Sequence, residues 1–210
     1  FGNFTAVTAS QLSTVNTSNT ITIAGINAAS AVSISGNGTF SIAGGAYTTS
    51  GNVTNGQTIT VRLTSSGSFS TAVSTTLTVG GVAGSYTVTT LAADTTPDAF
   101  GNFTAVTASQ LSTVNTSNAK TVTGLNTSTA VSISGNGTFS IAGGAYGTTG
   151  NISNNQSITV RLTSSGSFST AVSTTLTIGG ITGSYTVTTL AADTTPTAFG
   201  NFTAVTASQL

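Results

Sequence analysis

Charged side chains are almost absent from this sequence. Its 210 residues include three Lys or Arg and three Asp, with no Glu, His or Cys. The charged positions are Arg62, Lys120, Arg161, Asp94, Asp98 and Asp193. A nucleic-acid binder needs a basic stripe that neutralises phosphates, and three cations cannot form one. We therefore expect no nucleic-acid partner.

The same absences remove the common forms of catalysis. A Ser–His–Asp triad needs a histidine base, and zinc is usually held by Cys and His. Glycoside hydrolysis needs two neighbouring carboxyl groups, whereas the second half of the chain has one Asp. We predict that the protein is not an enzyme and carries no cofactor, with calcium as the one exception weighed below.

Long apolar runs are also missing, so we expect no membrane span. The mean hydropathy is +0.30 and the net charge is zero. Disordered chains combine low hydropathy with high net charge, so this chain is expected to fold. Because it starts and stops within a repeat and lacks an initiator Met, we interpret it as part of a longer array.

The repeat itself is the dominant feature of the chain. The twelve residues FGNFTAVTASQL occur unchanged at 1–12, 100–111 and 199–210. Aligning each residue with the one 99 positions later leaves 18 differences in 99 positions. The period predicts one domain at 1–99, a second at 100–198 and the first strand of a third at 199–210.

Each unit contains seven short runs typical of strands, separated by Gly, Asn and Ser. In the first unit these predicted strands are residues 3–9, 20–24, 31–35, 39–43, 58–64, 72–79 and 85–91. The pair Asn37-Gly38 predicts a tight hairpin between the third and fourth strands. The Gly-rich stretch 44–56 is expected to cross between two sheets, and Gly80-Gly81 is expected to form another hairpin.

Proline marks the boundaries between units. Pro97 and Pro196 occur once per unit in the sequences DTTPD and DTTPT, which predicts short, stiff linkers at about 92–99 and 191–198. Phe100 and Phe199 come shortly after Pro97 and Pro196, and Phe1 occupies the same position of the repeat. We expect each ring to pack against its own domain and the preceding one.

Seven short strands in about 99 residues favour an all-β fold, namely tandem antiparallel sandwiches of immunoglobulin-like or fibronectin-III-like type in a linear array. The segments TITIAGIN, SISGNGTFSIAGGAY, GQTITVRLTSS and GSYTVTT resemble the tandem Ig-like repeats of very large bacterial surface and secreted proteins. The resemblance covers both units and implies an extracellular or cell-surface location. It carries no catalytic residue.

Asp94 and Asp98 flank the first linker, and Asp193 lies in the second. One interpretation is a calcium site that stiffens the array, although calcium prefers six to eight oxygen ligands. The alternative is that each Asp caps a turn through its own backbone. We favour the turn.

Arg62 and Arg161 occupy matching outward positions on the clearest strand of each unit. They are predicted either to pair with Asp94, Asp193 or an acid of a neighbouring chain, or to remain solvated. An exposed ion pair contributes about 0–1 kcal/mol, and we favour solvation.

Sequons for N-glycosylation are frequent, but in a chain this rich in Asn, Ser and Thr many arise by chance, so they predict glycans only as a modification and with little specificity. They lie at Asn3, Asn16, Asn37, Asn52, Asn102, Asn115, Asn126, Asn136, Asn151 and Asn155.

These features predict a structural repeat protein outside the cell that forms a rod, filament, sheath or surface-layer element by stacking and self-association. The alternative is the spacer or stalk of a large bacterial adhesin with a separate binding tip. Residues 199–210 either begin a third domain or complete a neighbouring molecule by strand addition.

Overall fold

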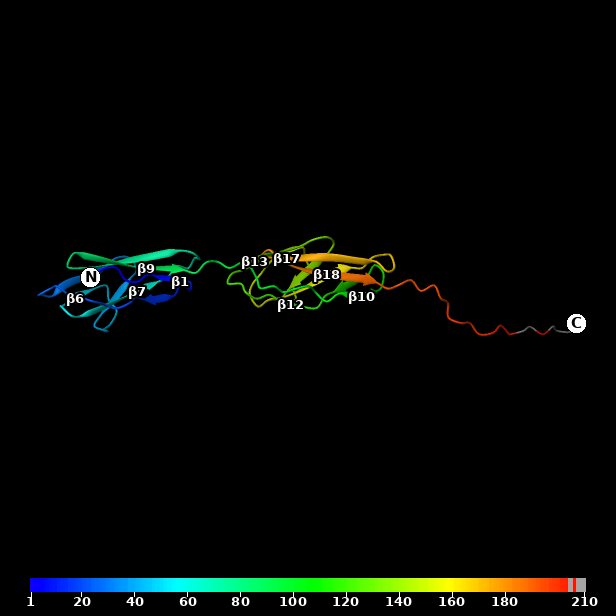
Figure 1. Ribbon diagram of the computed structural model, residues 1–210, viewed down its shortest axis with the longest axis horizontal. Coiled ribbons are helices and arrows are strands. Elements are labelled where there is room, and N and C mark those ends of the chain that lie inside the picture. Colours follow the sequence, from blue (N-terminus) through cyan, green and yellow to red (C-terminus); the bar gives the residue numbers. More distant parts are fainter. Residues whose placement is uncertain (204–205, 207–210) are drawn as a thin grey trace. The chain divides into compact units, whose positions relative to one another are not determined.

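A computed structural model describes residues 1–203 and 206, and every element in it is a strand (Figure 1). The chain divides into two compact units, Phe1–Ala93 and Asp94–Leu210. This boundary lies inside the predicted linker 92–99, so Pro97 belongs to unit 2, whereas the repeat period predicts a boundary after residue 99. The described part of the chain has no helix able to span a membrane.

Each unit is a β-sandwich of nine strands. Unit 1 contains β1 (Val7–Ser10), β2 (Val15–Thr17), β3 (Ile21–Thr22), β4 (Ser30–Ile34), β5 (Thr39–Ile42), β6 (Ser50–Val53), β7 (Thr58–Thr64), β8 (Ala72–Val79) and β9 (Val82–Thr90). Unit 2 contains β10 (Val106–Ser109), β11 (Val114–Thr116), β12 (Lys120–Thr121), β13 (Thr129–Ile133), β14 (Thr138–Ile141), β15 (Thr149–Ile152), β16 (Ser157–Thr163), β17 (Ala171–Ile178) and β18 (Ile181–Thr189).

The two sheets have the same order in both units. In unit 1, one sheet runs β1-β9-β8-β4-β6, and the other has β7 between β5 and the successive short strands β2 and β3. Gly80 and Gly81 form the two-residue turn of the β8–β9 hairpin, both with positive φ as a type I′ turn requires. That predicted hairpin is confirmed.

Three expectations about the strands need correction. The structure has nine strands per unit, because β2 and β6 lie in stretches that the sequence pattern leaves as loops. The first strand pairs with the last in parallel, so the sandwich is not wholly antiparallel. The run predicted as residues 3–9 forms a strand only from Val7.

The hairpin expected at Asn37-Gly38 is also wrong. Strand β4 pairs with β6 and β8, whereas β5 pairs with β7 in the other sheet, so the chain crosses between sheets here. The Thr75 hydroxyl donates to the Ser35 carbonyl, and a side chain at Gly38 would collide with Thr75. Glycine at position 38 therefore lets the chain pass close over β8 as it crosses between the sheets.

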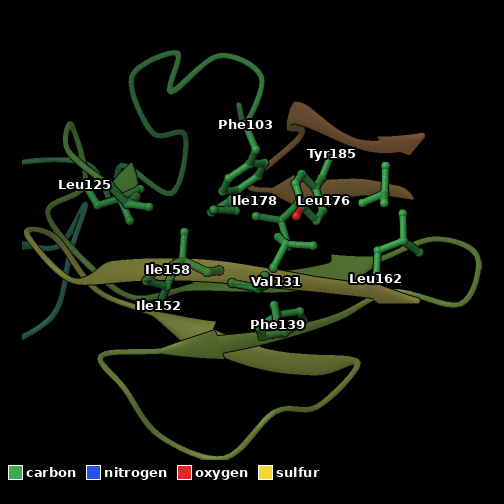
Figure 2. Packing of buried hydrophobic residues seen from close by; sticks show 13 residues of the cluster. Phe103, Leu125, Val131, Phe139, Ile152, Ile158, Leu162, Leu176, Ile178 and Tyr185 are labelled. Carbon is green, nitrogen blue, oxygen red and sulfur yellow. The ribbon is translucent and has the colours of Figure 1, made fainter. Parts of the chain in front are cut away.

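Apolar side chains from both sheets fill the space between them. In unit 2 the core includes Phe103, Leu176 and Tyr185, whose side chains point into this space (Figure 2). Their counterparts in unit 1 are Phe4, Leu77 and Tyr86. The period-two alternation of the long strands places the leucines and tyrosines of these sets inside, whereas Phe4 and Phe103 precede the first strand of their units.

The start of the repeated twelve-residue segment is anchored to β9. The Phe4 amide donates to the Ser85 carbonyl at 2.9 Å, and the Ser85 amide donates to Asn3 Oδ1 at 3.0 Å. Phe4 is 5% exposed and packs edge-on against Tyr86, with ring centroids 6.3 Å apart. The segment approaches β9 closely because position 84 is glycine.

The end of the same segment is tied down by a buried serine. Ser65 Oγ accepts a hydrogen bond from the Thr14 amide at 2.9 Å and donates to the Gln11 carbonyl at 2.6 Å. Ser164 makes the same two bonds in unit 2. One side chain thus holds together two loops far apart in the sequence.

We expect Ser65→Ala to lower the free energy of unfolding of unit 1 by about 1–2 kcal/mol, because two backbone groups lose their partner. Urea unfolding followed by circular dichroism measures the change. Ser33→Ala, at an exposed strand position, is the matched control. Equal stability of the two variants would contradict the role given to Ser65.

Candidate functional site

Two of the three linker aspartates accept hydrogen bonds from their own backbone, whereas Asp98 accepts from Thr123 Oγ1 at 2.9 Å, so the turn expected for Asp98 is not its contact. Asp94 Oδ1 accepts from the Thr96 amide at 3.0 Å, and Asp193 Oδ1 accepts from the Thr195 amide at 2.9 Å. This is the turn-capping geometry expected of Asp. The described residues include no group of three or more acidic, His or Cys side chains that could hold a metal ion. Calcium binding at these residues stays a prediction.

The first linker folds onto unit 2. Residues 94–98, which we call the junction segment, run along one end of that sandwich. The Asp94 amide donates to Asn126 Oδ1 at 2.7 Å, and the Asp98 amide donates to the Thr123 carbonyl at 2.8 Å. Pro97 is buried in this contact, whereas Pro196 is exposed.

The three phenylalanines that were expected to pack between domains differ in their surroundings. Phe1 contacts Phe4 edge-on at 6.3 Å between centroids, and Phe100 contacts Phe103 at 6.5 Å. Each of these two rings thus packs on its own unit. Phe199 is 79% exposed. Contact with a preceding domain stays a prediction, and half of the strand predicted at 199–210 lies outside the described residues.

Arginine and tyrosine form the most distinctive surface site, which we call the Arg–Tyr patch. The Arg62 guanidinium carbon lies 3.8 Å from the centroid of the Tyr47 ring, and its Nε donates to Thr17 Oγ1 at 3.2 Å. The Tyr47 hydroxyl is 3.1 Å from Thr60 Oγ1. These described partners of Arg62 include no carboxylate. The contacts hold the guanidinium over the ring.

The patch recurs in unit 2 with the same residue types. The guanidinium carbon of Arg161 lies 3.7 Å from the centroid of Tyr146, and its Nε donates to Thr116 Oγ1 at 3.2 Å. A shallow depression of about 280 Å³ adjoins the patch in unit 1, and one of about 270 Å³ adjoins it in unit 2. The depression in unit 1 is lined by Val15, Asn37, Thr39, Tyr47, Arg62, Leu63 and Thr64.

All seven lining positions are identical in the two units, although 18 of the 99 aligned positions differ. Val15 is 58% exposed and Val114 is 59% exposed, so an apolar side chain borders the patch in each unit. A planar cation stacked on an aromatic ring beside an exposed valine suits contact with carbonyl groups, carboxylates or another apolar surface.

The contacts of Tyr47 and Asn126 are the features of the candidate sites that the sequence patterns did not reveal. Tyr47 lies in a loop between β5 and β6, and only the folding of that loop places its ring under Arg62. Asn126 looks like one of many polar loop residues. No periodicity marks either position, although both have counterparts in the other unit.

Comparisons with known proteins show no family for this chain. No family model and no curated protein matches the sequence. Among solved structures, an I9–I11 tandem from titin is 11% identical with a TM-score of 0.31; the match covers 91% of this chain and 65% of that one, under two thirds of its length. A chimeric titin Z1Z2–Z1Z2 tandem, functionalized with a fibronectin peptide, is 13% identical with a TM-score of 0.22. That match covers 91% of this chain and 97% of the titin chain.

Proposed function

We propose that this chain is a structural, non-catalytic repeat protein of the cell exterior that associates laterally with copies of itself. The observation that carries the proposal is the Arg–Tyr patch, which every described unit presents with the same seven lining residues. A surface repeated once per unit can be matched by the same surface on a neighbour at regular intervals.

The character of the rest of the surface supports association. The net charge is zero and charged residues make up 3% of the chain, so electrostatic repulsion between copies is weak. Exposed Thr and Ser of the strands offer hydroxyl groups for hydrogen bonds to a neighbour. The extracellular location follows from the resemblance to bacterial surface repeats and is part of the proposal.

Electron microscopy of the purified chain tests this function. We expect fibres or a lattice for the wild type, and single particles for the double variant Arg62→Ala, Arg161→Ala. Lys120→Ala is the control, because it also removes positive charge but leaves both patches intact. Wild-type chains that stay single at high concentration would contradict self-association and favour the stalk of an adhesin.

A further inference from the structure

The chain contains three Asn-Gly pairs, namely Asn37-Gly38, Asn55-Gly56 and Asn136-Gly137. In such a pair the glycine amide nitrogen can attack the asparagine side chain, because no Cβ on the glycine shields that nitrogen. The attack closes a succinimide ring, so it needs an asparagine side chain that is free to turn toward the next residue. The hydrogen bonds of the three asparagine side chains therefore decide which pair reacts.

The side chains of Asn37 and Asn136 are free, whereas that of Asn55 is held. All three residues are exposed. Asn55 Oδ1 accepts a hydrogen bond from the Gly25 amide at 3.0 Å, which restrains its carboxamide. Within the described part of the chain, the side chains of Asn37 and Asn136 have no hydrogen-bond partner. Exposure is therefore shared by the three pairs, and restraint by a hydrogen bond separates them.

The packing of the fold requires the glycine of the free pairs. A Cβ on Gly38 would lie 2.9 Å from Ile34 Cδ1 and would collide with Thr75 Oγ1, where the chain crosses over β8. The same contacts surround Gly137 in unit 2. The reactive pair can thus be removed only by changing the asparagine, and both units contain the pair.

A cation lies beside each free asparagine. Asn37 and Arg62 line one depression, and Arg62 is the only charged residue among the seven that line it. The Arg62 Nε donates to Thr17, and no other donor of this guanidinium has a hydrogen-bond partner among the described residues. Asn136 and Arg161 line the matching depression of unit 2. A carboxylate at either asparagine position would therefore meet an arginine with donors to spare.

We propose that Asn37 and Asn136 are self-modifying sites, which convert to carboxylates beside Arg62 and Arg161. The glycine amide nitrogen bonds to the asparagine Cγ and loses its proton, and the side-chain nitrogen leaves as ammonia. Water then adds to one carbonyl of the succinimide and opens the ring. The product is aspartate or isoaspartate, and each carries a carboxylate that the asparagine lacked. The conversion needs water and no enzyme.

The new carboxylate changes the Arg–Tyr patch. It takes up the guanidinium donors that the proposed function leaves for a neighbouring copy, and it gives each converted unit a negative charge. We therefore expect conversion to weaken lateral association as the protein ages. This effect rests on the proposed function, whereas the conversion itself does not.

Mass spectrometry of peptides from the ageing chain tests the conversion. The folded full chain is kept in mildly alkaline buffer, and the mass change from amide to acid is followed at each Asn-Gly pair. We expect Asn37 and Asn136 to convert roughly 3- to 10-fold faster than Asn55, the effect of one hydrogen bond. In urea, where no fold restrains them, the three pairs should convert at similar rates. Equal rates in the folded chain would overturn the inference.

Carbon NMR tests the pairing with arginine. In the variant Asn37→Asp, the carboxyl carbon at position 37 should titrate at a lower pH than in Asn37→Asp, Arg62→Ala, because the guanidinium stabilises the ionised form. Arg161→Ala in the same background is the control, since it removes an equal charge from the other unit. Titration at the same pH with and without Arg62 would overturn the placement of the carboxylate beside it.

Electron microscopy of aged protein separates this inference from the proposed function. Fibres of the wild type should disperse with age, whereas fibres of Asn37→Ser, Asn136→Ser should persist, because serine cannot convert. Equal dispersal of both overturns the effect on association. A fresh wild-type chain that forms no fibres contradicts the proposed function, yet the rates of conversion can still be measured on it, so the two failures are distinguishable.

Discussion

Replacing Gly84 with valine is expected to lower the free energy of unfolding of unit 1 by about 3–5 kcal/mol. A Cβ at this position would lie 2.5 Å from the Gly2 carbonyl oxygen and 3.0 Å from Phe1 Cζ. The obstacle is backbone, so it cannot move aside as a long side chain would. The start of the repeated segment must therefore leave β9. Phe4 then loses its burial and its hydrogen bond to the Ser85 carbonyl, and Asn3 loses the hydrogen bond that it accepts from the Ser85 amide.

Thermal unfolding followed by 15N NMR measures this effect unit by unit. Signals of unit 2, which is unchanged in Gly84→Val, provide the internal reference. Gly2→Ala is the matched control, because a Cβ at Gly2 meets nothing within 4 Å. If Gly84→Val unfolds together with the control, the repeated segment does not contribute to the stability of the sandwich.

The strands that alternate most strictly were predictable from the sequence. The bounds of β7 and β8 agree with the predicted runs 58–64 and 72–79, because apolar side chains at every second position define both a strand and its inner face. Ile21 lies on the short edge strand β3 and is half-buried, which explains why Lys120 can replace it in unit 2.

The errors have a common physical cause. The strand β6, SGNV, has a single apolar residue, Val53, and it is held by pairing with β4 rather than by its own propensity. The crossing at Gly38 depends on Thr75, nearly 40 residues away. Such long-range partners leave no local pattern, so a turn-forming Asn-Gly pair was interpreted as a hairpin.

The candidate sites were predictable only in part. Arg62 could be singled out as a charge on the clearest strand, but its partner Tyr47 comes from a loop. The aspartates were assigned to turns, and the structure shows that geometry for Asp94 and Asp193. The role of Asn126 depends on how the linker folds back, which no residue spacing encodes.

Raising the pH above 10 is expected to destabilise both units through one buried tyrosine each. Tyr86 and Tyr185 are 0% exposed, and within the described residues their hydroxyl groups have no hydrogen-bond partner. Burial raises the pKa of both above the ordinary value of 10.0. Urea unfolding at pH values from about 8 to about 12, followed by circular dichroism, measures the effect.

The sign follows from proton linkage. Above pH 10 the unfolded chain releases the phenolic proton while the folded unit retains it, so the unfolded state binds fewer protons and the free energy of unfolding falls. The slope is about 1.4 kcal/mol per pH unit for each tyrosine, until the folded group itself ionises. Below pH 10 both states keep the proton, and the stability contributed by neutral burial is fully present.

The double variant Tyr86→Phe, Tyr185→Phe should lose this alkaline slope. At neutral pH it should be at least as stable as the wild type, because it removes two buried hydroxyl groups that lack partners. Tyr47→Phe with Tyr146→Phe is the matched control, since it removes the same group from the surface and leaves the buried pair in place. If the free energy of unfolding falls above pH 10 as steeply in Tyr86→Phe, Tyr185→Phe as in this control, the buried tyrosines are not the cause of the fall.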